Sequence, residues 1–405
     1  MTTQKKLLIY KVLLFLFAFF IAFMPATALR NKEVNSRVIV GILGLDGGDE
    51  KISITAQYVM PTETQGSTGK DTVTVEGETL DEAVEALNTA LGRRVELGHC
   101  SMVIVGSDVK PELLGSLLSA TDVTADVWMS AAQEKAEDLL GDLTDFMKKT
   151  GATDADFIAY SARKAHIATN TLLGFLSDLG SASKTAYLPL VEMQDSGDKE
   201  QGGEGGGSSG DSSGESSGGE EQSSGGGESG GGKGGEGEKP TGMKVEKLAV
   251  YGEHGRVCVL DSTSARGVAW VSAPVEKGTV CSDVEYEGKI IKGVCGRLLK
   301  KYATVNVDEK NGEATIKIKA YIEPHGDKFN SLFATNNKSA DAALIAGYKK
   351  KIQGEVESAY KDCLAVNVDP MFIGREFYRY HPDYFKSEYD YSAVKVKYDI
   401  EISLK

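Results

Sequence analysis

The side chains best suited to chemistry in this 405-residue chain are its five cysteines and five histidines. His99 and Cys100 are neighbours and could form a thiol–imidazole pair, the arrangement that activates a cysteine nucleophile. Neighbouring side chains of an extended segment point to opposite faces, so we expect these two to lie apart. His325 and His381 have no second ligand at motif spacing, and no two cysteines have the CxxC spacing of a metal site. These residues predict no metal site and no thiol chemistry.

Short catalytic motifs point the same way. Outside the glycine-rich residues 195–242, the sequence has no GxSxG, HExxH or GxxxxGK motif. The glycines inside that segment do not join a strand to a helix, as a nucleotide-binding loop requires. Asp46, Asp49 and Glu50 flank a glycine pair and could hold a cation, or they could form a polar hairpin turn. We expect a protein that is not an enzyme, with no catalytic residues and no cofactor.

Two cysteines are placed to form a disulfide. Cys281 and Cys295 are equally far from Gly288, which follows Glu287 in a plausible hairpin turn. Paired across that hairpin they would close a loop of about 15 residues and stabilise the fold by about 3 kcal/mol. The alternative is that both are small core residues. The other three cysteines lie in apolar segments and are expected to be buried thiols: Cys100, Cys258 and Cys363.

Aromatic and basic side chains alternate near the C-terminus, where they could bind a protein partner. Such side chains are enriched in interface hot spots, because they bury a large area and keep a polar group. The candidate partner-binding residues are Arg375, Arg379, Tyr380, Tyr384 and Phe385. The alternative is that the aromatic rings pack a long helix onto the last strand. A mixture is expected, with phenylalanines inside and arginines outside, so that charge reversal at Arg375 and Arg379 weakens assembly and leaves the fold intact.

A segment of Gly, Ser and Glu separates two foldable halves. Residues 195–242 contain 11 acidic residues and three lysines, so they carry about −8 of the net charge of −14. They have no apolar run that could offset the entropy of folding, and we expect a disordered tether that lets the halves move independently. The remaining parts are only mildly acidic, and nothing in them argues for nucleic acid.

The N-terminus resembles an export signal. Lysines at positions 5, 6 and 11 precede an apolar run over Val12–Met24, and Ala26–Ala28 has the small residues of a cleavage site. Residues 1–29 are therefore expected to be a signal peptide or, if uncleaved, a membrane anchor. In either case the rest of the chain is expected to be exported, because the lysines stay on the cytoplasmic side of the membrane.

Periodicity in the first half predicts alternating strands and helices. Strands are expected at 38–45, 52–58, 102–105 and 125–131, and helices at 111–118 and 134–140. Thr79 and Glu82 have the form of a capping box, and apolar residues at helical spacing continue from Leu80 to Gly92. Residues 154–191 are expected to add a helical piece that forms a small subdomain.

The second half begins with short strands and ends with a long helix and a strand. Strands are expected at 245–250, 257–260, 268–271 and 314–322, the last after a hairpin turn at Asn311 and Gly312. An apolar stripe predicts a helix over 341–364 that docks on the sheet. Strict alternation over 394–404 predicts a strand with one solvated face. The fold class is therefore mixed α/β or α+β, with two globular halves, each a mixed or antiparallel sheet with packed helices.

Short motifs are spread over both halves of the chain. In the first half they are Gly77-Glu78-Thr79, Leu91-Gly92-Arg93-Arg94, Gly98-His99, the strand from Met102 and Ala136-Glu137-Asp138-Leu139-Leu140. In the second half they are Asp369 through Gly374-Arg375, Tyr380-His381-Pro382, Tyr384-Phe385-Lys386 and the final strand. In their order and spacing these motifs resemble the Ger(x)C family, the C subunit of the spore nutrient germinant receptor.

The resemblance implies a non-catalytic, exported, membrane-associated subunit that works with polytopic A and B membrane subunits in germination signalling. Domains are then expected at 36–193, with the helical subdomain from about 154, and at 243–405, on either side of a disordered linker at 194–242. Family members typically carry lipid on a cysteine that ends the signal, yet no cysteine precedes Cys100. Attachment at the outer face of the cell or spore inner membrane would come from an uncleaved N-terminal segment or from partner subunits. The alternative function is an exported solute-binding or envelope scaffold protein unconnected with germination.

Overall fold

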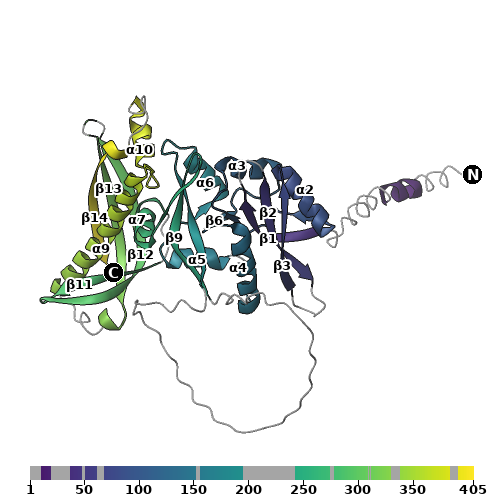
Figure 1. Cartoon of the computed structure of the whole chain (residues 1–405). Helices are drawn as coiled ribbons and strands as arrows, with labels where there is room; N and C mark the ends of the chain where they lie inside the picture. Colours follow the sequence, from purple (N-terminus) through teal and green to yellow (C-terminus); the bar gives the residue numbers. More distant parts are fainter. Residues whose placement is uncertain are drawn as a thin grey trace, which may run out of the picture.

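Two β-sheets with packed helices make up the protein, as the computed structural model in Figure 1 shows. The structure describes residues 11–19, 37–47, 51–61, 68–151, 156–194, 242–273, 278–308, 310, 312–329, 338–383 and 391–405. Residues 11–19 are helical, and the expected leader around them, like the expected disorder of 195–241, lies outside the described residues. The mixed fold class predicted from the sequence is confirmed.

The large sheet has ten strands in the order β10-β9-β8-β6-β5-β1-β2-β3, with β4 paired to β1 and β7 to β6. The strands β1, β5, β6 and β8 are parallel, and antiparallel strands continue the sheet at both ends. In chain order the strands are β1 Arg37–Asp46, β2 Ile52–Pro61, β3 Thr68–Gly77, β4 Arg94–Glu96, β5 Met102–Val105, β6 Trp128–Ala132, β7 Asn170–Thr171, β8 Ala186–Gln194, β9 Gly242–Gly252 and β10 Gly255–Leu260.

Helices cover both faces of this sheet, because alternate residues of its central strands are apolar in both directions. Ile42 and Ile104 belong to the apolar core on one face, and Leu43 and Val103 to the core on the other. The first core includes α4 (Ala136–Thr150) and α5 (Asp156–Lys164). The second includes α2 (Leu80–Leu91), α3 (Pro111–Ala120) and α6 (Leu172–Leu179).

Local capping agrees with the sequence at α2. Thr79 accepts a hydrogen bond from the backbone N–H of Glu82 at 3.2 Å, and the Glu82 carboxylate accepts one from Glu78 N. The helix ends at Gly92, whose φ of 58° lies in the left-handed region that glycine adopts at little cost. The predicted helix and both of its ends are confirmed.

The segment expected as a helical subdomain is part of the large sheet. Helices α5 and α6 are present, but the apolar run Tyr187–Leu190 belongs to β8, which pairs with both β6 and β9. Its fully buried residues line both cores, so β8 is an interior strand. The helical subdomain stays a prediction, but the strand at its end was not predicted, because a buried strand has no polar alternation to distinguish it from a buried helix end.

The large sheet also crosses the glycine-rich segment. Strands β8 and β9 flank residues 195–241 and pair antiparallel down to Gln194 and Gly242, which lie opposite each other. The segment therefore connects neighbouring strands of one sheet, and the expectation of independently moving halves does not hold. The expected domain boundaries stay a prediction, although β9 and β10 lie in the large sheet.

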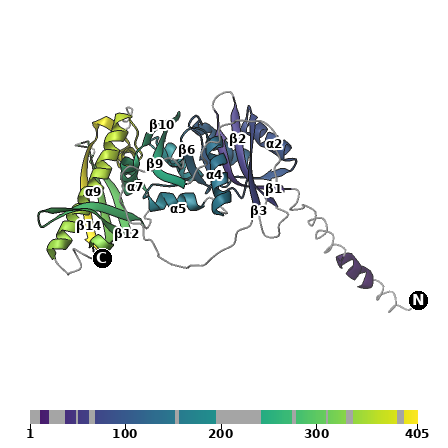
Figure 2. The ribbon, with the colours of Figure 1, turned by 60° about the horizontal axis from the view of Figure 1, so that its bottom comes forward.

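The small sheet has the order β11-β12-β13-β14. Its strands are β11 Thr279–Tyr286, β12 Lys289–Asp308, β13 Glu313–His325 and β14 Lys395–Leu404. The first three are antiparallel neighbours, and β14 pairs parallel with β13. The long helix α9 (Lys338–Ala365) packs its apolar stripe on one face, as expected, and Figure 2 shows it along this sheet at the end away from β1–β3.

One predicted strand of the second half is a helix. Residues 268–271 lie in α7 (Ser262–Ser272), which contacts β9, β12 and α9 and so joins the two sheets. Asp261 accepts hydrogen bonds from the N–H groups of Thr263 and Ser264, which starts the helix. The prediction was wrong because the valines of 268–271 favour a strand locally, whereas the cap at Asp261 begins a helix that includes them.

Candidate functional site

The C-terminal aromatic and basic residues gather on the short helix α10 (Ile373–Tyr380). Its start is fixed by Asp369, whose carboxylate accepts hydrogen bonds from Ile373 N at 3.0 Å and Gly374 N at 2.6 Å. The same carboxylate accepts one from the Ser183 hydroxyl at 2.7 Å. Burial raises the pKa of Asp369 to about 6, and the three hydrogen bonds oppose that shift. Asp369 thereby ties α10 to the loop before β8.

Arg375 belongs to the same internal junction. Its backbone N–H donates to Ser183 at 3.0 Å, and its guanidinium lies 3.7 Å from the Asp178 carboxylate of α6. The guanidinium also stacks over the Phe372 ring at 4.2 Å from the centroid and approaches Glu376 at 3.9 Å. Charge reversal here would set a carboxylate beside two others. Contrary to the expectation from the sequence, charge reversal at Arg375 should therefore destabilise the fold.

Arg379 and Tyr380 are oriented to the outside. The side chain of Arg379 is 67% exposed, and its ion pair with Glu376 is long at 3.5 Å. Tyr380 is 63% exposed, whereas Phe372 and Phe377 are buried. The expected mixture of inward phenylalanines and outward arginines matches these residues. Tyr384 and Phe385 lie outside the described residues.

A groove of about 310 Å³ runs beside α10. One wall is α10 with its preceding turn, and the other is the middle of β12 with the end of α7. The residues that line it are Val271, Ser272, Ala303, Thr304, Val305, Asn306, Met371, Phe372, Arg375, Glu376, Arg379 and Tyr380. The structure thus brings Arg375, Arg379 and Tyr380 together at one concave surface. The sequence did not predict that β12 forms part of this surface, because alternating side chains at 303–306 indicate a strand but do not show which elements lie beside it.

Other sequence candidates have structural roles. Asp46 is buried, and its carboxylate accepts hydrogen bonds from Ala136 N at 2.7 Å and Glu137 N at 2.8 Å, so it caps α4. Asp49 and Glu50 lie outside the described residues. His99 is exposed while Cys100 is buried, so the two side chains point apart. Among the described residues, no group of three His, Cys, Asp or Glu is placed to hold a metal ion.

The two cysteines expected to pair lie opposite each other in the β11–β12 hairpin and form a disulfide. The turn between them has Glu287 at φ 51° and Gly288 at φ 75°, the two left-handed residues of a tight hairpin turn. Cys100, Cys258 and Cys363 are free thiols. Within the described part of the chain, no helix is long and apolar enough to cross a membrane.

Comparisons with known proteins give two family matches. Residues 30–193 match a model described as spore germination protein N-terminal domain, and residues 246–405 match one described as spore germination B3/GerAC like, C-terminal. A solved structure described as the crystal structure of the GerBC protein is similar, with a TM-score of 0.46 and 14% sequence identity. The alignment covers 89% of this chain and 96% of that one. A comparison with curated proteins finds no match.

Proposed function

The chain belongs to the GerAC-like family of spore germination proteins, the germinant receptor C subunits, and we propose that it acts with polytopic A and B membrane subunits in germination signalling. The observation that carries this proposal is that both domains of the family match, in order, on either side of the glycine-rich segment. In this role the chain acts by contact with its partners and not by turnover of a substrate.

The groove beside α10 is the surface that we assign to a partner subunit. Arg379 and Tyr380 are exposed at its rim, where an arginine and an aromatic ring can be desolvated together by a partner. Buried Phe372 and Phe377 hold the helix to the protein. An interface here would bury exposed side chains without disturbing the core.

We propose that the protein is exported and works at the outer face of the cell or spore inner membrane. The apolar N-terminal run, helical over residues 11–19, supports attachment through that segment if it is not cleaved. Contact with the A and B subunits would supply a second attachment. N-terminal sequencing of the protein recovered from membranes distinguishes a cleaved from an uncleaved leader.

Co-purification from membranes tests the partner proposal. We expect an affinity-tagged chain to bring down the two polytopic subunits, and the double variant Arg379→Glu/Tyr380→Ser to recover at most about a tenth as much of them. Lys350→Glu, an exposed charge reversal on α9 outside the groove, is the matched control and should behave as wild type. Equal recovery by all three proteins would contradict the assigned surface, and recovery of neither subunit by wild type would contradict the proposed partners.

A further inference from the structure

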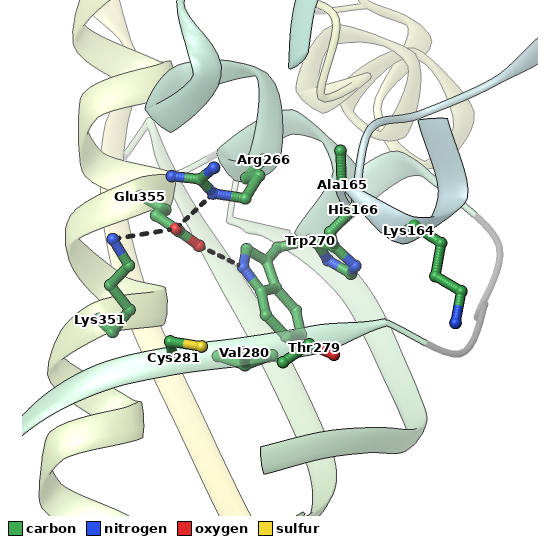
Figure 3. Close-up of a pocket in the computed structure, with 10 residues that line it drawn as sticks. All are labelled: Lys164, Ala165, His166, Arg266, Trp270, Thr279, Val280, Cys281, Lys351 and Glu355. Atoms are coloured by element: carbon green, nitrogen blue, oxygen red, sulfur yellow. Dashed lines mark hydrogen bonds and ion pairs between the residues drawn. The ribbon is translucent and has the colours of Figure 1, made fainter. Parts of the chain in front are cut away.

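A second cavity, of about 300 Å³, lies where α5 meets the elements of the small sheet. Figure 3 shows α9 and α7 on one side of it and the strand β11 on another, with the end of α5 facing them. The residues that line it are Lys164, Ala165, His166, Arg266, Trp270, Thr279, Val280, Cys281, Lys351 and Glu355. The cavity is distinct from the groove beside α10, since the two share no lining residue.

Positive charge predominates in the lining. Glu355, which is 3% exposed, accepts hydrogen bonds from Arg266 Nε and Trp270 Nε1, both at 2.8 Å, and lies 3.4 Å from Lys351 Nζ. Both of its oxygens are thus already engaged. Arg266 reaches Glu355 through Nε, so its two terminal amino groups are not used in that bond. Three cations, Lys164, Arg266 and Lys351, therefore line the cavity against the single carboxylate of Glu355, which leaves the lining with an excess of positive charge.

This cluster is set by the close approach of two helices. Gly267 of α7 lies against the backbone of α9 at Glu355, where an added Cβ would collide with the Glu355 carbonyl. The absence of a side chain at this position lets Arg266 and Trp270, on either side of the contact, reach the same carboxylate. The site is held by packed helices and not by surface loops, so its groups are fixed before any ligand arrives.

His166 supplies a polar group with no use inside the protein. It lies two residues past the end of α5, in a left-handed conformation with φ of 58°, and its ring centroid is 4.4 Å from that of Trp270. Its Nε2 atom is buried and has no hydrogen-bond partner among the described residues. Burial, with Lys301 and Arg266 nearby, lowers the pKa of His166 to about 3, so at neutral pH the ring is uncharged and has one N–H to donate. Buried polar atoms without a partner are rare, so His166 has hydrogen-bonding capacity that the described residues do not use.

We propose that this cavity binds a small organic anion, with its carboxylate held by Arg266, Lys351 and His166 and its apolar body against Ala165 and Val280. The terminal edge of a guanidinium matches a carboxylate in shape as well as charge. The volume exceeds that of an inorganic anion, and the apolar wall suits a short hydrocarbon or ring. The bound anion would contact α5, which precedes residue 195, and α7, β11 and α9, which follow residue 241. This site is independent of the proposed contact with other subunits, because this chain alone supplies the residues that line the cavity.

Isothermal titration calorimetry of the full-length chain in mild detergent tests this proposal. The probe is benzoate, and its uncharged counterpart benzamide has nearly the same shape. We expect saturable binding of benzoate and affinity for benzamide at least about tenfold weaker, since a charge-assisted hydrogen bond is lost. Saturable binding of both with equal affinity, or of neither, would overturn the proposal.

Matched variants locate the binding. Lys351→Gln and His166→Asn should each weaken benzoate binding by about tenfold. Asparagine tolerates the left-handed backbone, so His166→Asn removes the imidazole with little effect on folding. Lys350→Gln removes the same charge from the neighbouring exposed position of α9 and should leave the affinity unchanged. Benzoate binding that is insensitive to both Lys351→Gln and His166→Asn, in variants with wild-type melting temperatures, would place the anion elsewhere and contradict the assignment.

Discussion

At the scale of single residues, the most unusual group in the protein is the buried lysine of β12. Lys301 is 1% exposed, donates a hydrogen bond to the Ala269 carbonyl of α7, and lies 5.7 Å from the Trp270 ring centroid. Burial lowers the pKa of Lys301 to about 7. A β-bulge between Leu298 and Lys300 explains how a charged residue came to face the core, because it shifts the inward alternation by one residue.

Lys301 makes stability depend on pH in a definite direction. A lysine whose pKa is lower in the folded state contributes stability above its unfolded pKa of 10.5, and loses that contribution as the pH falls through about 7. We therefore expect the contribution of Lys301 to the free energy of unfolding to decrease from pH 10 to pH 7. In Lys301→Met, which keeps the length and removes the charge, this decrease should vanish and stability at pH 7 should rise. Ala269 O keeps a partner in Ala273 N. Urea unfolding at several pH values measures both; the same pH dependence in wild type and variant would contradict this account.

Asp46 is a second single residue on which the stability of the fold should depend. Its carboxylate caps α4 from the end of β1, 90 residues earlier in the chain. Asp46→Ala should lower the free energy of unfolding by about 1–2 kcal/mol, because two helix N–H groups lose their acceptor. Asp138→Ala, an exposed acid in the first turn of the same helix, is the control and should cost less than about 0.5 kcal/mol. Equal losses in chemical denaturation would contradict the capping role.

At the scale of elements, the β11–β12 hairpin depends on its disulfide. Cys281 and Cys295 face each other in the register, and the bond closes a loop of 15 residues. We expect the double variant Cys281→Ser/Cys295→Ser to unfold with about 3 kcal/mol less free energy than the oxidised protein. A reducing agent should lower the stability of wild type by a similar amount and leave the double variant unchanged. A reducing agent without effect on wild type would contradict the pairing.

Sequence patterns predicted the elements that carry their own signals. The capped helix α2, the stripe of α9, the turn at Glu287 and Gly288 and the alternation of β14 are all local, and each matches the structure. Short apolar runs that suit a strand as well as a helix were predicted wrongly, as in α7 and β8. Roles that depend on distant partners were not predicted. Asp46 as a cap, Lys301 in the core and the meeting of Arg266 with Glu355 depend on tertiary contacts that no spacing in the chain encodes.

At the scale of the whole molecule, the glycine-rich segment closes a hairpin. Because Gln194 and Gly242 lie opposite each other in β8 and β9, a tight turn can replace residues 195–241 without moving either strand. We expect a variant with a four-residue turn there to fold and to gain about 2 kcal/mol, since shortening the loop roughly tenfold lowers its closure entropy. A large loss of stability, measured by thermal unfolding at several scan rates, would contradict the pairing of these strands.

Both proposed sites lie beside the elements that connect the two sheets. Strands β9 and β10 extend the large sheet, α7 contacts both sheets, and Ser183 and Asp369 join the loop before β8 to α10. The partner groove and the anion cavity both lie along this junction: α7, β12 and α10 line the groove, and residues 164–166 meet α7, β11 and α9 at the cavity. A ligand in the cavity therefore contacts segments from both sides of the glycine-rich segment.

Photo-crosslinking in intact membranes tests most directly the claim that the chain acts by docking to membrane subunits through the α10 groove. A photoreactive residue in place of Tyr380 should crosslink to a polytopic A or B subunit, and the same residue in place of Lys350 should not. Crosslinking at neither position, with the protein present in the membrane fraction, or equal crosslinking at both, would contradict the account.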